Sequence, residues 1–156
     1  MCSSDLAKAE EARITVAEGA DEVDMVLDVG GLLSGDLAAV YDDILGVVGA
    51  ARPVPVKVIL ETSMLTDEQK AIACLIAART GAAYVKTSTG FGGGGATPED
   101  IALMRHMVGD RLGVKASGAV RNHRDAEKVL HAGADRIGAS ASIAIIGGGD
   151  AGAGGY

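Results

Sequence analysis

Five short runs rich in β-branched residues alternate with amphipathic helical patterns along the chain, and this alternation constrains the fold most strongly. Each run is a near-continuous apolar stretch interrupted by one or two polar residues, as expected of a strand that is buried on both faces. The runs span residues 22–29, 55–61, 83–88, 112–117 and 134–139. Strands that alternate with helices in this way predict a train of βα units and a parallel sheet.

Helices are expected between the strands, and most of them begin at recognisable caps. One begins at Thr66 with a capping-box pattern, and another begins at Thr97, which is followed by a proline and two acidic residues. A third begins at Asn122 and ends at Gly133, a plausible left-handed cap. The remaining helical patterns span residues 6–18 and 36–51.

Composition and charge exclude several classes of protein. The 156 residues carry 14 basic and 21 acidic side chains, a net charge of −7, which argues against nucleic acid as a partner. No apolar run approaches the roughly 20 residues of a membrane helix, and the N-terminus lacks the pattern of a secretory signal. Two cysteines, Cys2 and Cys74, make a disulfide framework unexpected and suit the reducing cytoplasm.

Two architectures are built from βα trains, namely the open doubly wound sheet and the closed eight-stranded barrel. Four of the predicted strands carry an ionisable residue in an apolar context, and the fifth ends in the small residues 138–140. The four residues are Asp24, Lys57, Lys86 and Lys115. Functional residues on every strand favour the barrel. A complete barrel needs about 200–250 residues, so the chain is expected to form an open sheet or to lack the first strands of a barrel.

Lys86 and Lys115 are the strongest chemical signal. A lysine inside a buried strand is costly, and two neighbouring lysines lower each other's pKa. A neutral amine of this kind can attack a carbonyl group. The alternative is that each lysine forms a structural ion pair with a carboxylate such as Asp24 or Glu61.

Small residues at three predicted strand ends form a second signal. Residues 87–90, 117–118 and 138–140 combine glycine with hydroxyl side chains where a strand passes into a helix. Backbone N–H groups in such loops can bind a phosphate, and barrels often hold phosphate after their last strands. The alternative is that these glycines only form tight turns.

The sequence resembles the deoxyribose-phosphate aldolase family from about Ala7 to Tyr156. The motifs that carry the resemblance lie at 22–26, 56–62, 86–97 and 115–118, and they include the highly specific VKTSTGF at 85–91. The resemblance implies a class I, metal-independent aldolase without a cofactor on a (β/α)₈ barrel, of which this chain would contain about the last five units. It also implies cleavage of 2-deoxyribose 5-phosphate to glyceraldehyde 3-phosphate and acetaldehyde in deoxyribonucleoside catabolism, and it is compatible with a homodimer.

The resemblance also implies roles for individual residues. Lys86 becomes the Schiff-base nucleophile, Lys115 the lysine that lowers its pKa and transfers protons, and Asp24 the carboxylate of the proton relay. Tyr156, at the end of a glycine-rich tail, matches the C-terminal tyrosine that assists proton transfer in many members. The residues expected to bind the substrate and its phosphate are Thr89, Gly90, Gly118, Ala119, Gly138 and Ser140.

The chain departs from the family pattern at several positions. Asp28 stands where members commonly have Asn, and its charge is expected to raise the pKa of Asp24. Ala119 replaces a second glycine and adds a methyl group beside the expected phosphate. Residues 92–93 are two glycines in place of a more polar pair, which is expected to loosen their loop.

The resemblance also predicts the organisation of the chain. Residues 1–6 do not resemble the family and are interpreted as a non-native leader. Residues 7–146 are expected to form the partial barrel, and residues 147–156 a flexible tail. Because three strands of the barrel would be missing, the isolated chain is expected to be poorly stable and inactive.

Two alternatives to an active aldolase remain from the sequence. One is an inactive fragment of such an aldolase, and the other is a different phosphate-binding barrel that uses lysine electrostatically, such as an isomerase. The histidines lack the spacing of metal ligands and are expected to be solvated, whereas Cys74 is expected in the core. The histidines are His106, His123 and His131.

Overall fold

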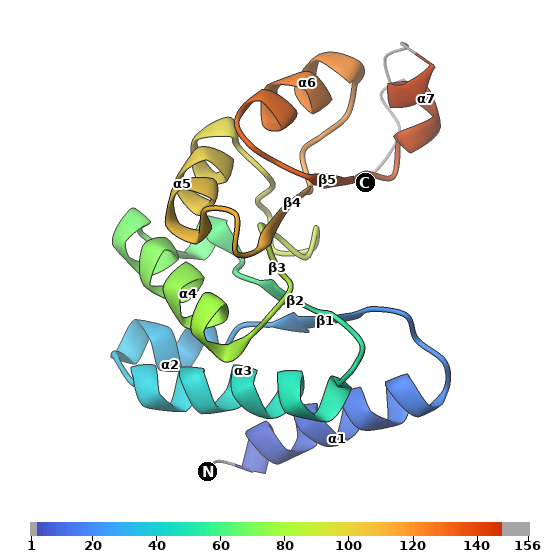
Figure 1. Ribbon diagram of the computed structural model, residues 1–156. Coiled ribbons are helices and arrows are strands. Elements are labelled where there is room, and N and C mark those ends of the chain that lie inside the picture. Colours follow the sequence, from blue (N-terminus) through green and yellow to red (C-terminus); the bar gives the residue numbers. More distant parts are fainter. Residues whose placement is uncertain (1–2, 148–156) are drawn as a thin grey trace.

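The computed structural model describes residues 3–147, which contain one parallel sheet of five strands (Figure 1). The order of the strands in space is their order in the chain, β1-β2-β3-β4-β5. A doubly wound sheet would reverse its strand order at a switch point, so this sheet is wound in the manner of a barrel. The strands are β1 Val23–Val26, β2 Val56–Ile59, β3 Tyr84–Lys86, β4 Gly113–Ser117 and β5 Arg136–Gly138.

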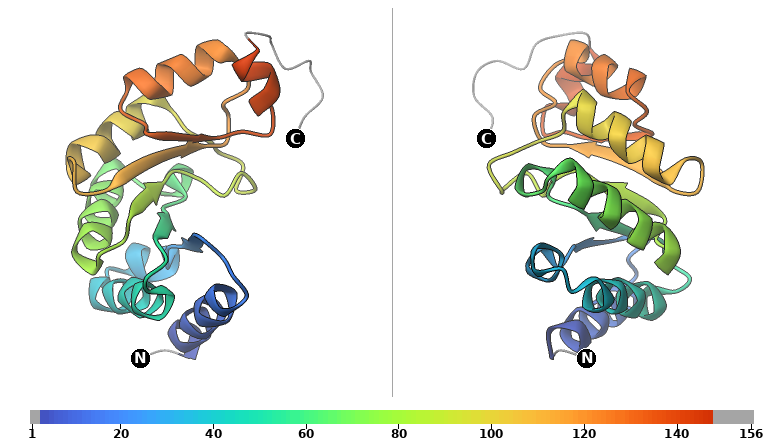
Figure 2. Two further views of the ribbon diagram at one scale, coloured as in Figure 1. Left: turned by 45° about the vertical axis from the view of Figure 1, so that its right-hand side comes forward. Right: turned by 90° about the vertical axis from the view of Figure 1, so that its left-hand side faces the viewer.

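Helices follow the strands along the outside of the curved sheet (Figure 2). Because the crossovers between parallel strands are right-handed and the order never reverses, the crossover helices cover the same face. The opposite face, which would line the inside of a barrel, carries the site described below. The helices are α1 Ser3–Ala17, α2 Val29–Ser34, α3 Leu37–Ala51, the short 3₁₀ helix η1 Thr62–Met64, α4 Asp67–Thr80, α5 Pro98–Val108, α6 His123–His131 and α7 Ser142–Ile146.

Three predicted helix starts are confirmed by their hydrogen bonds. Thr66 and Gln69 form the reciprocal capping box of α4. Thr97 caps α5, with Pro98 in its first turn, and Asn122 caps α6. Each cap satisfies backbone N–H groups that have no partner inside the helix.

The core lies between the sheet and the helices and is built from small and branched aliphatic side chains, as the scarcity of aromatic residues predicts. The central strands contribute Val58, Val85 and Val114, and α5 contributes Ile101, all of them fully buried. Cys74 on α4 is also fully buried, and burial raises the pKa of its thiol to about 12. The prediction that Cys74 is a core residue is confirmed.

The segment after β1 differs from the prediction. The strand ends at Val26 instead of Val29, and Val29 begins helix α2. Asp28 caps this helix by accepting a hydrogen bond of 3.0 Å from the N–H of Gly31. Helix α2 is not apparent from the sequence, because residues 26–33 continue the apolar run of the strand. A helix cap inside such a run produces no change in the hydrophobic periodicity.

The predicted division of the chain into a leader, a partial barrel and a tail stays a prediction. Helix α1 begins at Ser3, so the division expected after residue 6 falls within a helix. The short helix α7 and Gly147 end the described part, and Tyr156 lies outside the described residues. No helix within residues 3–147 is long and apolar enough to cross a membrane.

Candidate active site

Charged side chains from several strands meet on the face of the sheet that the crossover helices leave uncovered. The register pairs Asp24 of β1 with Lys57 of β2, and Lys86 of β3 with Lys115 of β4. Because side chains alternate between the two faces of a strand, these residues share one face. The four ionisable residues that the sequence places on four separate strands therefore belong to one cluster, and we call it the lysine cluster.

Asp24 lies at the centre of the lysine cluster. Its Oδ1 accepts a hydrogen bond from Lys57 Nζ and its Oδ2 accepts one from Lys86 Nζ, both at 2.8 Å, while Lys115 Nζ lies 4.0 Å from Oδ2. Partial burial alone would raise the pKa of the Asp24 carboxyl, but the hydrogen bonds from the two lysines outweigh it, so the pKa lies below its ordinary value. Asp24 is therefore an ionised hydrogen-bond acceptor in reach of three amines.

Asp28 does not raise the pKa of Asp24, and that prediction is wrong. The pKa of Asp24 is lowered, and the groups that shift it most besides burial are Lys57 and Lys86. The Asp28 carboxylate is instead engaged as the cap of α2. Asn and Asp are comparably good caps, so either residue suits this position of the helix.

Lys57 was not selected from the sequence as a site residue, although it lies closest to Asp24 in the register. Its side chain is only 5% exposed and lies 2.8 Å from both Asp24 and Glu22. Burial would lower the pKa of Lys57, but the hydrogen bonds that Lys57 donates to the two carboxylates outweigh burial, so the pKa is raised. Lys57 is thus a fixed cation that holds Asp24 in place.

Lys115 has the opposite electrostatic character. Burial lowers the pKa of Lys115, the charge of Asp24 opposes this effect, and the nearby charges of Lys86 and Lys57 lower the pKa further. The net result is a pKa below the ordinary value for lysine. Lys115 is therefore an amine whose own pKa is lowered, and its predicted effect on Lys86 stays a prediction.

A second ion pair joins the two outer strands of the described sheet. Glu22, next to β1, accepts a hydrogen bond of 2.5 Å from Arg136 of β5, and the Arg136 guanidinium lies 4.5 Å from the ring centre of Tyr84. Since Glu22 also contacts Lys57, the carboxylate connects this pair to the lysine cluster. The contact spans the curved face, and it restrains the curvature that brings Asp24 to Lys86.

The loop after β3 is fixed by a residue that the sequence did not identify as part of the site. Glu61, directly after the β2 segment, accepts hydrogen bonds at Oε2 from the N–H and the hydroxyl of Thr89. Glu61 is 4% exposed and has a left-handed backbone with φ 56°. No local sequence signal identifies a non-glycine residue in this conformation.

The other predicted substrate-binding residues lie at the end of β5, as Gly138 does, or in the segments that follow β3, β4 and β5. Gly90 and Gly118 have positive φ angles of 92° and 75°, as predicted for tight turns at these strand ends. Gly138 lies beside Lys115, because a Cβ atom at this position would stand 3.3 Å from Lys115 Cε. Ser140 is exposed at the start of the following turn. Their role as a phosphate site stays a prediction.

Gly92 and Gly95 in the stretch after Phe91 are closely packed, whereas a Cβ atom on Gly93 would meet nothing within 4 Å, so the expected loosening of the loop at 92–93 stays a prediction. A Cβ atom on Gly92 would lie 2.9 Å from Glu61 Cδ, and one on Gly95 would lie 2.5 Å from the Cβ of Ala119. Real Cβ atoms do not approach other atoms so closely, so a larger side chain would displace Glu61 or the loop after β4. Glycine at these positions permits close packing of three loops.

Ala119 has a left-handed backbone, with φ 59°, which alanine adopts at a cost of about 1–2 kcal/mol relative to glycine. Glycine also loses more conformational freedom on folding, which offsets part of this difference. Ala119→Gly is therefore expected to raise the free energy of unfolding by about 0.5–1 kcal/mol. The midpoint of chemical denaturation measures the change.

The matched control is Ala102→Gly, which makes the same chemical change at an exposed position inside helix α5. It is expected to lower the free energy of unfolding by about 1 kcal/mol, the cost of glycine in a helix interior. Equal destabilisation by both substitutions would contradict the interpretation that Ala119 is strained.

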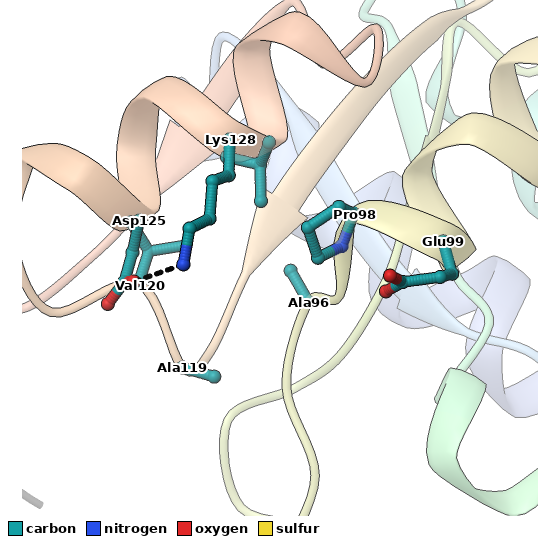
Figure 3. A pocket seen from close by; sticks show the side chains of 8 residues that line it. Ala96, Pro98, Glu99, Ala119, Val120, Asp125 and Lys128 are labelled. Carbon is teal, nitrogen blue, oxygen red and sulfur yellow. Dashed lines mark ion pairs between the residues drawn. The ribbon is translucent and has the colours of Figure 1, made fainter.

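A pocket of about 400 Å³ opens beside the loop after β4, between the beginnings of α5 and α6 (Figure 3). Asp125 and Lys128 form an ion pair of 3.8 Å at its rim, and Ala119 forms part of its wall. No residue of the lysine cluster lines it, so the pocket is separate from that cluster, although Ala119 is among the residues predicted to bind the substrate. Its lining consists of Ala96, Pro98, Glu99, Ala119, Val120, Asp125, Lys128 and Val129.

Within residues 3–147, no group of three or more His, Cys, Asp or Glu side chains is arranged to hold a metal ion. The three histidines are exposed on α5 and α6, as expected for solvated side chains, and they are His106, His123 and His131.

Comparisons with known proteins identify relatives over most of the chain, although no family model matches it. A curated relative from Rhodospirillum rubrum, named deoxyribose-phosphate aldolase, is 58% identical over 144 residues, which are 92% of this chain and 60% of the relative. An aldolase structure named QR15 has a TM-score of 0.86 at 35% identity, over 90% of this chain and 64% of that one.

A further solved structure, described as a unique tetrameric structure of deoxyribose phosphate aldolase from Aeropyrum pernix, has a TM-score of 0.80 at 34% identity. It matches 89% of this chain and 59% of its own. The chain thus spans about 60% of the length of the curated relatives it matches. The five βα units described here correspond to part of a barrel.

Proposed function

We propose that this chain, which is homologous to the deoxyribose-phosphate aldolases over about nine tenths of its length, carries the imine-forming part of such an aldolase. The observation that carries the proposal is the convergence of Lys86, Lys115 and Asp24 on one face of the sheet. The proposed reaction cleaves 2-deoxy-D-ribose 5-phosphate to D-glyceraldehyde 3-phosphate and acetaldehyde.

In the proposed reaction, the neutral amine of Lys86 attacks the aldehyde carbon C1 of the open-chain sugar. Loss of water from the adduct gives a protonated imine. A base removes the proton of the C3 hydroxyl, the C2–C3 bond breaks, and its electron pair enters the enamine that remains on Lys86. C3 leaves as the aldehyde of glyceraldehyde 3-phosphate. Protonation of the enamine carbon and hydrolysis of the imine release acetaldehyde and restore the amine.

Asp24 and Lys115 are the groups proposed to move the protons. The Asp24 carboxylate contacts Lys86 Nζ at 2.8 Å, so it can accept the proton that Lys86 must lose before it attacks. Lys115 lies opposite Lys86 in the register and has a lowered pKa, which suits an amine that both donates and accepts protons. Tyr156 is proposed to assist the protonation of the enamine.

The ion-pair interpretation of the lysines is compatible with this mechanism. The structural ion pair predicted as an alternative is present between Lys86 and Asp24, but their side chains remain 13% and 32% exposed. A substrate aldehyde can therefore reach the pair. Lys57 differs from Lys86 because its own side chain is only 5% exposed, which suits a structural role beside the same carboxylate.

Phosphate recognition is proposed for the loops that contain Gly90, Gly118 and residues 138–140. The first two loops follow β3 and β4, residues 138–140 begin with the last residue of β5, and all three segments lie at the carboxyl ends of the strands, where barrels bind their substrates. The backbone N–H groups of such turns bind anions without a charged side chain. The proposed barrel domain spans residues 7–146, with residues 1–6 as a leader and 147–156 as a tail.

The test is reductive trapping with borohydride, which converts an imine into a stable adduct. The assay uses two proteins. One is the 156-residue chain. The other, called the extended protein, carries at the N-terminus of this chain the residues of the Rhodospirillum rubrum relative that precede the matched region. With acetaldehyde, the extended protein is expected to gain one ethyl group, which peptide mapping locates on Lys86.

The outcomes separate the remaining alternatives. An enzyme that uses lysine only electrostatically would give no adduct, and an adduct on Lys115 instead of Lys86 would overturn the assignment. Trapping in the extended protein without trapping in the 156-residue chain would identify the chain alone as an inactive fragment.

The partners and location of the protein are proposed from its relatives and composition. The relative from Aeropyrum pernix is described as tetrameric, and we propose that this protein also associates with copies of itself. Its small-molecule partners would be phosphorylated sugars and aldehydes, and its location the cytoplasm. Sedimentation of the extended protein measures the association.

A further inference from the structure

Glu61 combines two energetically unfavourable features. It has a left-handed backbone, with φ 56° and ψ 61°, and its acidic side chain is almost completely buried. Both are unfavourable for this residue type, because a Cβ atom crowds the left-handed backbone and a buried carboxylate loses its hydration. Such strain persists where the surroundings impose it, and it concentrates at functional sites.

The hydrogen bonds of the Glu61 carboxylate go to the loop that follows Lys86. Oε2 accepts hydrogen bonds from the N–H of Thr89 at 3.1 Å and from its hydroxyl at 2.6 Å. The Thr89 hydroxyl oxygen accepts a hydrogen bond of 3.1 Å from the N–H of Phe91. Gly92 then packs so closely against the carboxylate that a Cβ atom would lie 2.9 Å from it. The carboxylate thus contacts Thr89 and Gly92 directly and holds Phe91 through the Thr89 hydroxyl.

These hydrogen bonds determine what the Thr89 side chain can still do. A threonine hydroxyl has one proton to donate and two lone pairs that accept. The proton is committed to Glu61 and one lone pair to Phe91, so a single lone pair remains. Thr89 can therefore accept a hydrogen bond from a substrate hydroxyl, but it cannot donate one to a phosphate oxygen.

We propose that Glu61 is a positioning residue, which orients Thr89 so that it accepts a hydrogen bond from a hydroxyl group of the sugar. The inference rests on the proposed function, because Thr89 lies three residues after the lysine that would hold the sugar. It also narrows the expected role of Thr89, from a ligand of the substrate or its phosphate to a ligand of a hydroxyl group.

The test compares two substrates that both form an imine with Lys86, each reduced by borohydride to an adduct of its own mass. Acetaldehyde has no hydroxyl group, whereas 2-deoxyribose 5-phosphate has the hydroxyls that Thr89 would recognise. The readout is the ratio of the borohydride trapping rates of the sugar and of acetaldehyde, because this ratio cancels any general change in the reactivity of Lys86. The same variants are measured by amide hydrogen exchange at Thr89 and Phe91.

Two variants of Glu61 separate positioning from stability. Glu61→Gly relieves the left-handed backbone and removes the carboxylate, and it is expected to lower the trapping ratio at least ~10-fold because the loop loses its anchor. Glu61→Gln retains an oxygen that can accept both hydrogen bonds from Thr89, so it is expected to keep the ratio within about threefold of the parent, since only the charge of the acceptor is lost. Thr89→Val, which removes the hydroxyl alone, is expected to reproduce the loss.

The amide exchange should follow the same order, with protection at Thr89 lost in Glu61→Gly and kept in Glu61→Gln. A parental ratio and parental protection in Glu61→Gly would overturn the inference, and so would equal losses in both Glu61 variants. If the parent protein traps neither substrate, the proposed function fails, while the exchange data still decide whether Glu61 positions the loop.

Discussion

Replacing Lys86 by alanine is expected to abolish reductive trapping and to lower the rate of cleavage of 2-deoxyribose 5-phosphate about 10⁴-fold or more, the scale found when a catalytic nucleophile is removed. Without the amine no imine forms, and the electrons of the C2–C3 bond have no iminium group to enter. The measurement is the rate of acetaldehyde release by the extended protein, together with the mass of the protein after treatment with borohydride.

The Lys86→Arg variant is the matched control for charge. Arginine can keep the ion pair that Lys86 forms with Asp24 at 2.8 Å, but its guanidinium group is always protonated and does not form an imine. Both variants should therefore lose the activity to a similar extent. If Lys86→Arg retained the parental rate, the lysine would act by its charge, and the electrostatic alternative would be correct.

The fold could be predicted from the sequence because its determinants are local. The apolar runs fall where buried strands require them, and side chains next to the helices, such as Thr66 and Thr97, give the hydrogen bonds expected of caps. Helix α2 was missed for a physical reason as well. Its cap, Asp28, lies within an apolar run that continues from the strand, so the change from strand to helix leaves no break in the pattern.

The site could be predicted only in part, because its geometry depends on contacts between distant segments. A lysine inside an apolar strand can be recognised in the sequence as unusual, because burying its charge is unfavourable. Both Lys86 and Lys115 are recognised in this way. The contact between Asp24 and Lys86 joins residues 62 positions apart and depends on the register and curvature of the sheet. Lys57 and Glu61 were missed because their importance appears only when β2 is placed beside its neighbours.

The two lysines also illustrate what local chemistry leaves undecided. From the sequence, both are buried amines followed by small residues, and only the family resemblance assigned the nucleophile. The structure distinguishes them by their surroundings, since Lys86 is hydrogen-bonded to Asp24 while Lys115 lies 4.0 Å from the same oxygen and has a lowered pKa. The proposed division of roles therefore predicts different consequences for their removal.

Lys115→Met is expected to lower the rate of cleavage about 10²-fold, the contribution of one positioned acid–base group, while leaving the trapping of acetaldehyde on Lys86 intact. Methionine keeps an unbranched side chain in the space beside Gly138 and removes only the amine. Lys128→Met is the control, because this exposed lysine on α6 lies outside the lysine cluster, and its rate should equal that of the parent.

The pH profile tests the same role by a second measurement. If protonated Lys115 donates the proton, the rate must fall as the pH rises through its pKa, which lies below the ordinary value of 10.5. The parent should therefore have an alkaline limb below pH 10.5 in its profile of kcat/KM, and Lys115→Met should lack that limb. The charge of Asp24 raises the pKa of Lys115, so the variant Asp24→Asn, which retains Lys115, should have its alkaline limb at a lower pH than the parent. An alkaline limb that persists unchanged in Lys115→Met would assign it to another group and remove Lys115 from the proton relay.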